Sequence, residues 1–145
     1  MIGLIQRVKQ ASVIIQQTQI ASINTGILLF LGVERNDSAE NVDKLLRKVL
    51  NYRIFNDNDQ RMNLSITDLK GELLIVSQFT LVADTEKGNR PGFSRGATPE
   101  HGHAMFSEFV RKATEQHTRV GAGVFGAEMQ ISLLNDGPAT FWLKT

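Results

Sequence analysis

The segment that most restricts the fold of this chain is the apolar run GILLFLGV at residues 26–33. A strand with one face in water alternates apolar and polar residues. A short uninterrupted run is instead typical of a strand that is buried on both faces. We therefore predict a central strand here, and the rest of the chain has to cover both of its faces.

Two amphipathic helices are predicted to supply part of that cover. Asp37 and Glu40 have the spacing of a capping box before the first helix, and Thr98 followed by Pro99 has the pattern of a capped start for the second. Behind each start, apolar residues recur at helical spacing. The predicted buried stripes are Val42, Leu45, Leu46, Val49 and Leu50 in the first helix and Met105, Phe106, Phe109, Val110 and Ala113 in the second.

Most of the remaining chain has the composition and alternation of strands. NDNDQ between residues 52–55 and 62–67 predicts a hairpin, and the polar stretch 84–98 predicts a long loop. No repeat or linker divides the chain, so we expect one domain over residues 1–145, an α/β domain rich in antiparallel pairs. The other predicted strands are residues 1–8, 11–16, 72–82, 119–124, 127–134 and 139–144.

Charge and cysteine content exclude several classes of protein. The formal net charge of +1 is too small for nucleic-acid binding by overall charge, so any such contact has to be local. Without cysteine the chain has no disulfide and no thiolate metal site. It shows no signal-peptide pattern and no membrane-spanning run, so we expect a cytoplasmic protein without a membrane partner. Lys44, Arg47 and Lys48 on the first helix are predicted to be solvated, with an RNA contact as the alternative.

Side chains that form familiar catalytic centres are not grouped in the sequence. No nucleophile elbow, phosphate-binding loop or dinucleotide motif occurs. His101 and His103 form an H-x-H pair, but residues i and i+2 of a helix point apart, and no further ligand lies nearby. We expect no metal and no cofactor, with a metal-dependent hydrolase built on these histidines as an alternative. The pattern favours a reaction that positioning and backbone dipoles can promote.

Two short stretches depart from the strand patterns around them. SQFT at residues 77–80 puts three polar side chains inside the predicted strand 72–82. They need partners unless that strand faces water or a subunit boundary. NDGP at residues 135–138 puts a proline between two apolar segments, and proline cannot donate to a ladder. It predicts a turn that either has no further role or presents its backbone to a closely bound ligand.

Both stretches resemble the signature motifs of the D-aminoacyl-tRNA deacylases, a family also called D-tyrosyl-tRNA deacylases. The motifs are SQFTL at residues 77–81 and NDGPAT at residues 135–140. The resemblance covers essentially the whole chain. Segments similar to the family also include, in order, QRVKQASV at 6–13, LLFLGVERND at 28–37, RIFND at 53–57, MNLSI at 62–66, KGNRP at 87–91 and GVFGAEMQISLLNDGP at 123–138.

The resemblance implies a homodimer with a barrel-like, strand-rich fold and an active site at the dimer interface. The implied reaction is hydrolysis of the ester that joins a D-amino acid to the 3′-terminal adenosine of tRNA, and glycine on mischarged tRNA is an implied second substrate. The implied partners are tRNA and a second copy, not DNA. Gly137 and Pro138 are implied to form a cis peptide that enters the partner's pocket, where backbone carbonyls exclude an L side chain.

The family pattern assigns the catalytic role to Ser77, Gln78, Phe79 and Thr80. Backbone N–H groups of this stretch are implied to stabilise the oxyanion, while the 2′-hydroxyl of the RNA assists. Thr80 is either a nucleophile or a hydroxyl that positions the substrate. The sequence shows no base to activate it, which favours positioning.

Other side chains are implied to hold the RNA end. Phe125 and Met129 resemble the adenine pocket of the family, with plain core packing as the alternative. Asn135 and Thr140 flank the Gly-Pro pair and are implied to bind substrate. Contact with tRNA phosphates needs no base reading and suits an enzyme that handles many tRNAs. The basic residues implied to make that contact are Lys87, Arg90 and Arg95.

An alternative from another functional class stays open. A protein that binds the 3′ end of RNA, or a nucleotide, without turnover would keep the same pocket, and no side chain of the two motifs is certainly essential for chemistry. Turnover of a D-aminoacyl-tRNA separates these two hypotheses. Insensitivity to a chelator would remove the metal-dependent hydrolase.

Overall fold

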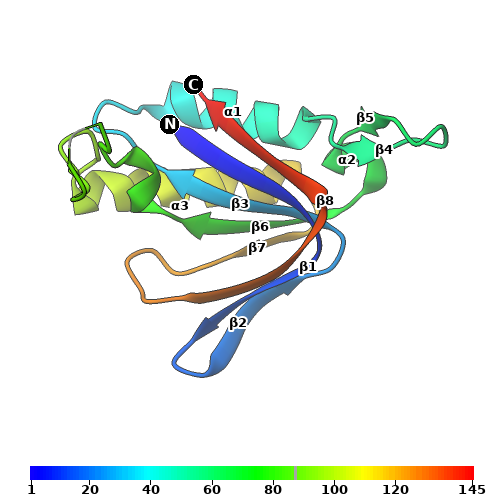
Figure 1. Cartoon of the computed structure of the whole chain (residues 1–145), viewed down its shortest axis with the longest axis horizontal. Coiled ribbons are helices and arrows are strands. Elements are labelled where there is room, and N and C mark those ends of the chain that lie inside the picture. Colours follow the sequence, from blue (N-terminus) through cyan, green and yellow to red (C-terminus); the bar gives the residue numbers. More distant parts are fainter. Residues whose placement is uncertain (87) are drawn as a thin grey trace.

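A strongly curved sheet forms the centre of the molecule, and two long helices cover one of its faces (Figure 1). The computed structural model describes residues 1–86 and 88–145. The two termini lie together, where Thr145 N–H donates to the carbonyl of Met1 at 3.1 Å. The elements in chain order are β1 (Ile2–Ile15), β2 (Thr18–Ile23), β3 (Gly26–Gly32), α1 (Ala39–Asn51), β4 (Phe55–Asn56), β5 (Met62–Leu64), α2 (Ile66–Leu69), β6 (Glu72–Ser77), the 3-10 helix η1 (Phe79–Val82), α3 (Pro99–Gln116), β7 (Val120–Ala122) and β8 (Gln130–Lys144).

The sheet has the strand order β2-β1-β3-β6-β7, and β8 pairs with β1 outside this path. β1 pairs antiparallel with β2, β3 and β8, whereas β3–β6 and β6–β7 are parallel. The two ends of the path approach each other, because a Cβ built on Gly121 would lie 3.5 Å from Cβ of Ala21. The predicted α/β class with a mixed, barrel-like sheet and two main helices is therefore confirmed.

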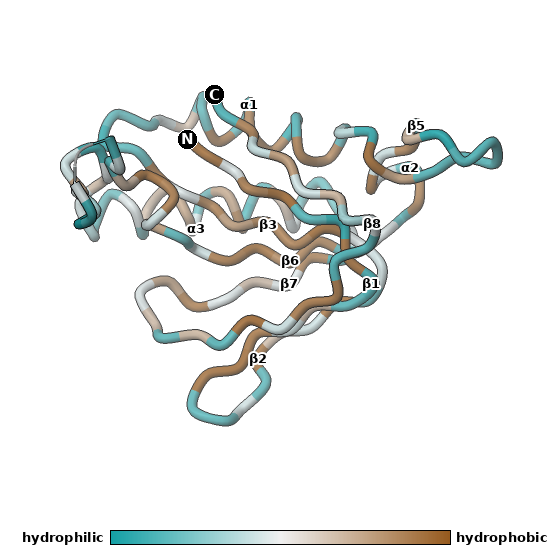
Figure 2. The backbone as a smooth tube through the Cα atoms, in the orientation of Figure 1, coloured by the Kyte–Doolittle hydropathy of each residue, from teal (hydrophilic) through white to brown (hydrophobic). Residues whose placement is uncertain are grey.

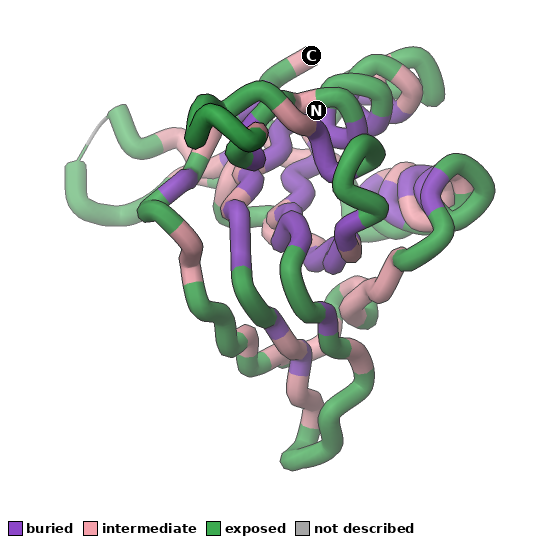
Figure 3. The backbone as a smooth tube through the Cα atoms, turned by 90° about the vertical axis from the view of Figure 1, so that its right-hand side faces the viewer, coloured by how far each residue is buried: buried purple, intermediate pink, exposed green. Residues whose placement is uncertain are grey.

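β3 is buried on both faces, as its apolar run predicts. Ile27 and Leu29 belong to a core beneath the two long helices, and Leu28 belongs to a second core inside the curved sheet. β6 repeats this pattern, with Leu73 in the first core and Leu74 in the second. Figure 2 shows both strands as a largely hydrophobic centre, and Figure 3 shows buried residues gathered between sheet and helices. Each strand lies between two cores, so neither can alternate with polar residues.

Both long helices carry the predicted apolar stripes, although Met105 and Val110 of α3 are only partly buried, and one of the two predicted caps is wrong. Thr98 caps α3 as expected, because its hydroxyl accepts a hydrogen bond from His101 N–H at 3.3 Å. α1 is instead capped by Ser38, whose N–H and hydroxyl both donate to Asn41 Oδ1 at 3.0 Å. Asp37 is not available as a cap because its carboxylate is engaged by the Met1 ammonium and by Glu34 N–H.

Several predicted strand limits are wrong because strand pairing extends across the expected breaks. Segments 1–8 and 11–16 form the single strand β1, and segments 127–134 and 139–144 both belong to β8. β2 was not predicted at all. Its hairpin turns at Gln16 and Gln17, which both have positive φ, and glutamine is not a turn signal.

The predicted strand at 72–82 is correct only as far as Ser77. Gln78 N–H still donates to the carbonyl of Leu31 at 2.8 Å, and then the chain turns into η1. The polar motif therefore does not alternate between two faces of a strand. It lies at the carboxyl end of β6, where Phe79 and Thr80 are exposed.

The remaining elements follow the predictions at lower precision. The hairpin around NDNDQ is present as β4 and β5, although both strands are shorter than expected and residues 66–69 form α2. The strand expected at 119–124 is reduced to β7. Among the described residues, none of the helices combines the length and apolar character that crossing a membrane would require.

Candidate functional site

A cavity of about 520 Å³ opens at the carboxyl ends of the parallel strands β3 and β6. Its walls come from these strand ends, from η1, from the first turns of α3 and from the segment between β7 and β8. The carboxyl edge of parallel strands is a common place for ligand binding, because loops diverge there. Residues that line it include Leu31, Ser77, Thr98, Gly102, Phe125 and Met129.

The SQFT motif forms one wall and the rim of this cavity. Ser77, Gln78 and Phe79 line it, and Phe79 is 66% exposed at its mouth, where its ring lies 5.1 Å from that of Phe93. Thr80 is beside the cavity, and its hydroxyl accepts a hydrogen bond from the amide of Gln78 at 2.5 Å. An amide N–H cannot take up a proton, so this contact does not activate the hydroxyl.

Phe125 and Met129 line the same cavity, so the structure brings them together with the SQFT motif. The Phe125 ring packs against Phe106, with 5.9 Å between centroids, and both Phe125 and Met129 border the buried cores. Close packing fixes this wall, because a Cβ on Gly102 would lie 3.1 Å from Phe125 Cζ. The two residues are therefore both core and cavity lining, and neither alternative from the sequence excludes the other.

The Gly-Pro pair lies on the surface and away from this cavity. Gly137 and Pro138 are exposed, and the peptide bond between them is cis. The buried guanidinium of Arg7 donates to the carbonyls of Asp136 and Ile54, at 2.9 and 2.5 Å. This turn is thus anchored to the protein from beneath.

Asn135 and Thr140, which were predicted to bind substrate, close the turn on itself. Asn135 Oδ1 accepts from Ala139 N–H at 3.0 Å, and its Nδ2 donates to the carbonyl of Ala139 at 3.2 Å. The hydroxyl of Thr140 accepts from Gln6 Nε2 at 3.1 Å. Every one of these contacts restricts the turn, so the backbone at Gly137 is held in a fixed position.

In one copy of the chain, the turn and the cavity lie at opposite ends of β3. Register places Asn135 opposite Val8 and Thr140 opposite Gln6, and these β1 residues pair with the first residues of β3. The cavity begins at Leu31, three to five residues further along β3 than these partners, Leu28 and Gly26. At a rise of about 3.3 Å per residue, the separation along the strand is roughly 10 to 16 Å.

The basic loop is only partly free to meet an anion. Arg90 is exposed. Arg95 lies 3.2 Å from Glu86 and 3.5 Å from Asp84, and its hydrogen bond to Glu86 together with these charges raises the pKa of its guanidinium. Arg95 therefore orders the loop as well as carrying charge. Lys87 lies outside the described residues.

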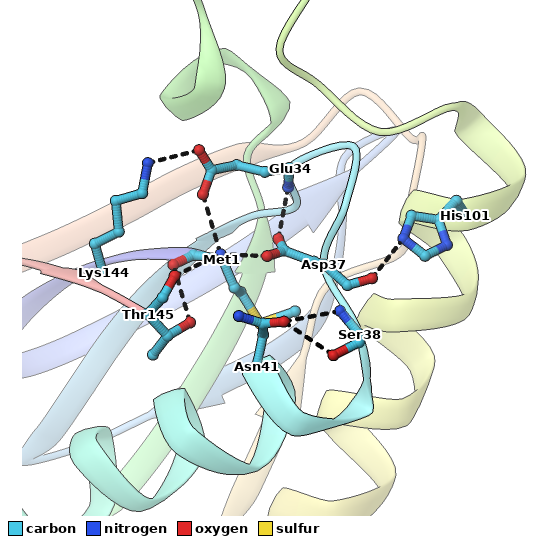
Figure 4. Close-up of polar contacts among 8 residues, drawn as sticks. All are labelled: Met1, Glu34, Asp37, Ser38, Asn41, His101, Lys144 and Thr145. Atoms are coloured by element: carbon cyan, nitrogen blue, oxygen red, sulfur yellow. Dashed lines mark hydrogen bonds and ion pairs between the residues drawn. The ribbon is translucent and has the colours of Figure 1, made fainter.

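A charged network joins both ends of the chain to the segment that follows β3 (Figure 4). The Met1 ammonium is fully buried and contacts Asp37 Oδ1 at 2.5 Å and Glu34 Oε2 at 3.1 Å. Lys144 Nζ contacts the other Glu34 oxygen at 2.7 Å. Burial raises the pKa of Glu34, but its hydrogen bonds to Lys144 and to the ammonium outweigh this and hold it below the ordinary value of 4.5.

The two histidines of the H-x-H pair contact different partners. His101 Nε2 lies 2.8 Å from the carbonyl oxygen of Asp37, whereas the His103 ring meets Phe125 edge to face. Within residues 1–86 and 88–145, no three His, Cys, Asp or Glu side chains are grouped closely enough to hold a metal ion.

Sequence reasoning missed Arg7, Phe93 and Gly102 as parts of these two regions. Arg7 stands in a strand next to apolar residues, and only the sheet pairing brings it under the turn. Phe93 and Gly102 lie in segments read as a polar loop and a helix start, with no local signal that they border a cavity.

Comparison with known proteins agrees with this geometry. The family model described as D-Tyr-tRNA(Tyr) deacylase matches residues 4–144. Proteins named D-aminoacyl-tRNA deacylase from Alteromonas mediterranea and Pseudoalteromonas atlantica are 55% and 56% identical to this chain. The alignments cover 97% of both chains for the first and 99% of both for the second. The chain therefore belongs to the D-Tyr-tRNA(Tyr) deacylase family, a family of hydrolases, as the motifs predict.

Two solved structures have the same fold over nearly the whole chain. One, named c-Myc DNA Unwinding Element Binding Protein, has a TM-score of 0.96 at 34% identity, over 100% of this chain and 99% of that one. The other, described as a probable eukaryotic D-amino acid tRNA deacylase, has a TM-score of 0.84 and covers 99% of this chain and 98% of that one. Its identity of 17% supports similarity of fold alone.

Proposed function

We propose that this protein hydrolyses the ester that joins a D-amino acid to the 3′-terminal adenosine of tRNA. The observation that carries the proposal is a single cavity lined by Ser77, Gln78 and Phe79 on one side and by Phe125 and Met129 on the other. Family membership supplies the reaction class, and the relatives' name supplies the substrate class. The reaction adds water across the ester: the acyl carbon gains a hydroxyl, the bond to the 3′ oxygen breaks, and that oxygen takes a proton.

The backbone of η1 is the proposed source of oxyanion stabilisation. The first N–H groups of a helix have no partner within it, and here they belong to Phe79, which lines the cavity, and to Thr80, the next residue. A donor of this kind is worth about 3–4 kcal/mol in other enzymes. An aminoacyl ester next to a ribose 2′-hydroxyl is already reactive. Positioning of the ester and two such backbone donors are therefore proposed to be sufficient for its hydrolysis.

Thr80 is proposed to position the substrate rather than to attack it. Its hydroxyl is hydrogen-bonded to the amide of Gln78, and a nucleophile would need a base in that place. The adenine is proposed to occupy the slot between Phe125 and Met129, where an aromatic ring and a thioether offer flat apolar contact.

Chirality is proposed to be read by the Gly137–Pro138 turn of a second copy of the chain. The turn is exposed, is anchored by Arg7, and lies roughly 10 to 16 Å along β3 from the cavity of its own copy. Leu134 and Trp142, on the same strand, are 54% and 53% exposed, and a second copy seated on β8 would cover these large apolar side chains. A homodimer in which each turn closes the partner's cavity accounts for both observations.

Rejection of L substrates then follows from close backbone packing. A rigid turn packed against the α-carbon of the substrate leaves room for only a hydrogen atom at the position where an L-amino acid carries its side chain. An L-aminoacyl ester therefore cannot enter, whereas a D-aminoacyl ester can. Glycine has no side chain to exclude, so glycyl-tRNA is also proposed as a substrate. Arg90 and Arg95, with Lys87, are proposed to meet acceptor-stem phosphates without reading sequence.

Paired deacylation time courses on D-tyrosyl-tRNA and L-tyrosyl-tRNA, with glycyl-tRNA alongside, test the proposal. The expected result is rapid loss of the D ester and of glycine, with the L ester spared and with no effect of a chelator. Tight binding of an RNA ending in CCA without loss of any ester would contradict the proposal and favour a 3′-end binding protein. Loss of activity in chelator would favour the metal-dependent hydrolase.

A further inference from the structure

The H-x-H pair at the start of α3 has no part in the proposed reaction, yet the His103 ring contacts Phe125 in the cavity wall, and His101 holds the helix turn that contributes Thr98 and Gly102 to it. α3 contributes Thr98 and Gly102 to the lining, and His101 and His103 lie beside them in the same turns. The two histidines point to opposite sides, one toward the β3–α1 connection and the other toward Phe125.

His101 fastens the first turn of α3 to the segment that leaves β3. Its Nε2 lies 2.8 Å from the carbonyl oxygen of Asp37 (Figure 4), and an oxygen acceptor requires that Nε2 carry the proton. The Asp37 side chain is itself held by Glu34 N–H at 2.6 Å and by the Met1 ammonium. The first turn of α3 is therefore bound to the segment between β3 and α1, and the contacts of the Asp37 side chain hold that segment in place.

His103 supports the aromatic wall from the solvent side. Its ring centroid lies 5.4 Å from that of Phe125 at an interplanar angle of 71°, an edge-to-face arrangement. Phe106 and the bare Cα of Gly102 hold the same ring from beneath. Three residues of α3 therefore contact the Phe125 ring, namely Gly102, His103 and Phe106, and His103 is the exposed one.

We infer that His101 and His103 are positioning residues for the adenine slot. His101 sets the place of α3 relative to the end of β3, and His103 sets the orientation of the Phe125 ring, so together they fix the width of the cavity. Neither contacts the ester. The inference rests on the proposed function, because the ligand of the slot is the terminal adenosine of tRNA.

The first test measures binding of an RNA end in the adenine slot, in the absence of ester hydrolysis. A short RNA ending in CCA, with 2-aminopurine as the terminal base, reports stacking in the slot through fluorescence quenching. His103→Ala is expected to weaken binding by about threefold to tenfold, the range of an aromatic pair. His103→Phe restores a ring edge and is expected to restore binding. Equal affinity for the wild type and His103→Ala would overturn the role of His103.

The second test separates positioning from general stability. His101→Ala is expected to raise KM for D-tyrosyl-tRNA about threefold to tenfold with kcat unchanged, and His101→Gln, which keeps a donor near the Nε2 position, is expected to restore KM. His117 is a matched control, because its Nε2 makes a comparable 2.7 Å contact with the Gly71 carbonyl at the other end of α3. His117→Ala is expected to lower Tm and leave KM unchanged.

The outcomes distinguish this inference from the proposed function. If the wild type neither binds the RNA probe nor deacylates D-tyrosyl-tRNA, the proposed function fails and the slot has another ligand. If the wild type does both and KM rises equally in His101→Ala and His117→Ala, the histidines act only through stability and the inference is wrong. A rise confined to the His101 and His103 variants supports it.

Discussion

The two ends of β3 differ in what holds them and in what they offer. At the carboxyl end, apolar side chains and a 3-10 turn enclose a cavity. At the amino end, hydrogen bonds from Arg7 and Asn135 hold an exposed turn in place. Among the described residues, those of this turn do not line the cavity. A cavity needs a complementary cover, and a rigid exposed turn is suited to provide one. The proposed homodimer would bring the two different ends together, one from each copy of the chain.

The largest expected effect comes from a substitution in the turn. Gly137 has a φ of 141°, and a Cβ there would lie 2.9 Å from Ala139 N and 3.0 Å from the Arg7 guanidinium. Gly137→Ala therefore has to displace the turn, and a displacement near 1 Å can cost about 100-fold at a reacting centre. We expect the preference for D-tyrosyl-tRNA over L-tyrosyl-tRNA to fall by about that factor in paired time courses.

A control substitution at a second glycine, and an experiment that mixes two variants, test whether the turn acts on the partner's cavity. Gly92→Ala is the control, because its Cβ would make an ordinary 3.7 Å contact. Ala127 lines the cavity, so Ala127→Trp fills it and leaves the turn intact. Excess Ala127→Trp protein mixed with Gly137→Ala protein should then suppress hydrolysis of the L ester and preserve that of the D ester. Unchanged L hydrolysis would show that the turn acts within its own copy.

A smaller effect is expected from the apolar wall of the cavity. Phe125→Ala removes the ring proposed to stack on adenine, and such stacking is worth about 1–3 kcal/mol per base. KM for D-tyrosyl-tRNA should rise roughly 10- to 100-fold, with D over L preference retained, because the turn is untouched. Steady-state kinetics with a Tm measurement check this. Loss of chirality discrimination in a folded Phe125→Ala protein would contradict the separation of the two ends.

A still smaller effect is expected at Thr80, where the side chain and the backbone are assigned different roles. Thr80→Val keeps the backbone N–H and removes the hydroxyl, so kcat should fall less than about tenfold if the backbone carries the oxyanion. Single-turnover kinetics measure the chemical step directly. Complete loss of activity, or a trapped acyl-enzyme in the wild type, would identify Thr80 as the nucleophile.

The smallest effect concerns the stability contributed by the charged network around Glu34, and it depends on pH. The pKa of Glu34 is lowered in the folded protein, so its contacts stabilise the fold fully above the unfolded value of 4.5. That stabilisation is lost as pH falls from 4.5 through the folded pKa. Glu34→Gln should reduce the free energy of unfolding by less than about 1 kcal/mol at pH 7, with little difference left in strong acid.

Denaturant unfolding at pH 7 and below pH 4 measures that effect, and the chain offers a surface control. Glu40 also has a lowered pKa, through its hydrogen bond to Lys44, but this pair is exposed. Glu40→Gln should therefore change stability less than Glu34→Gln does. An equal change in both variants would mean that the Met1 network adds nothing beyond a surface ion pair.

The secondary structure was largely predictable where a pattern is local. The run at residues 26–33, the helical stripes and the Thr98 cap all depend on residues close in sequence, and all three are confirmed. The Asp37–Glu40 cap failed because the Asp37 carboxylate has a stronger partner in the Met1 ammonium, which is remote in sequence. The strand at 72–82 was predicted too long, because pairing with β3 ends at the bond from Gln78 N–H to the Leu31 carbonyl and the chain then turns into η1.

The sequence by itself determined the family, the two motifs, the central strand and the buried faces of the helices. These depend on residue type and spacing, and hydrophobic periodicity reports which face is buried. Only the tertiary structure decided that the SQFT motif meets Phe125 in one cavity, that Arg7 lies beneath the turn, and that turn and cavity lie at opposite ends of β3. The physical reason is that strand pairing and competition for buried donors and acceptors join residues far apart in the chain, which no local pattern encodes.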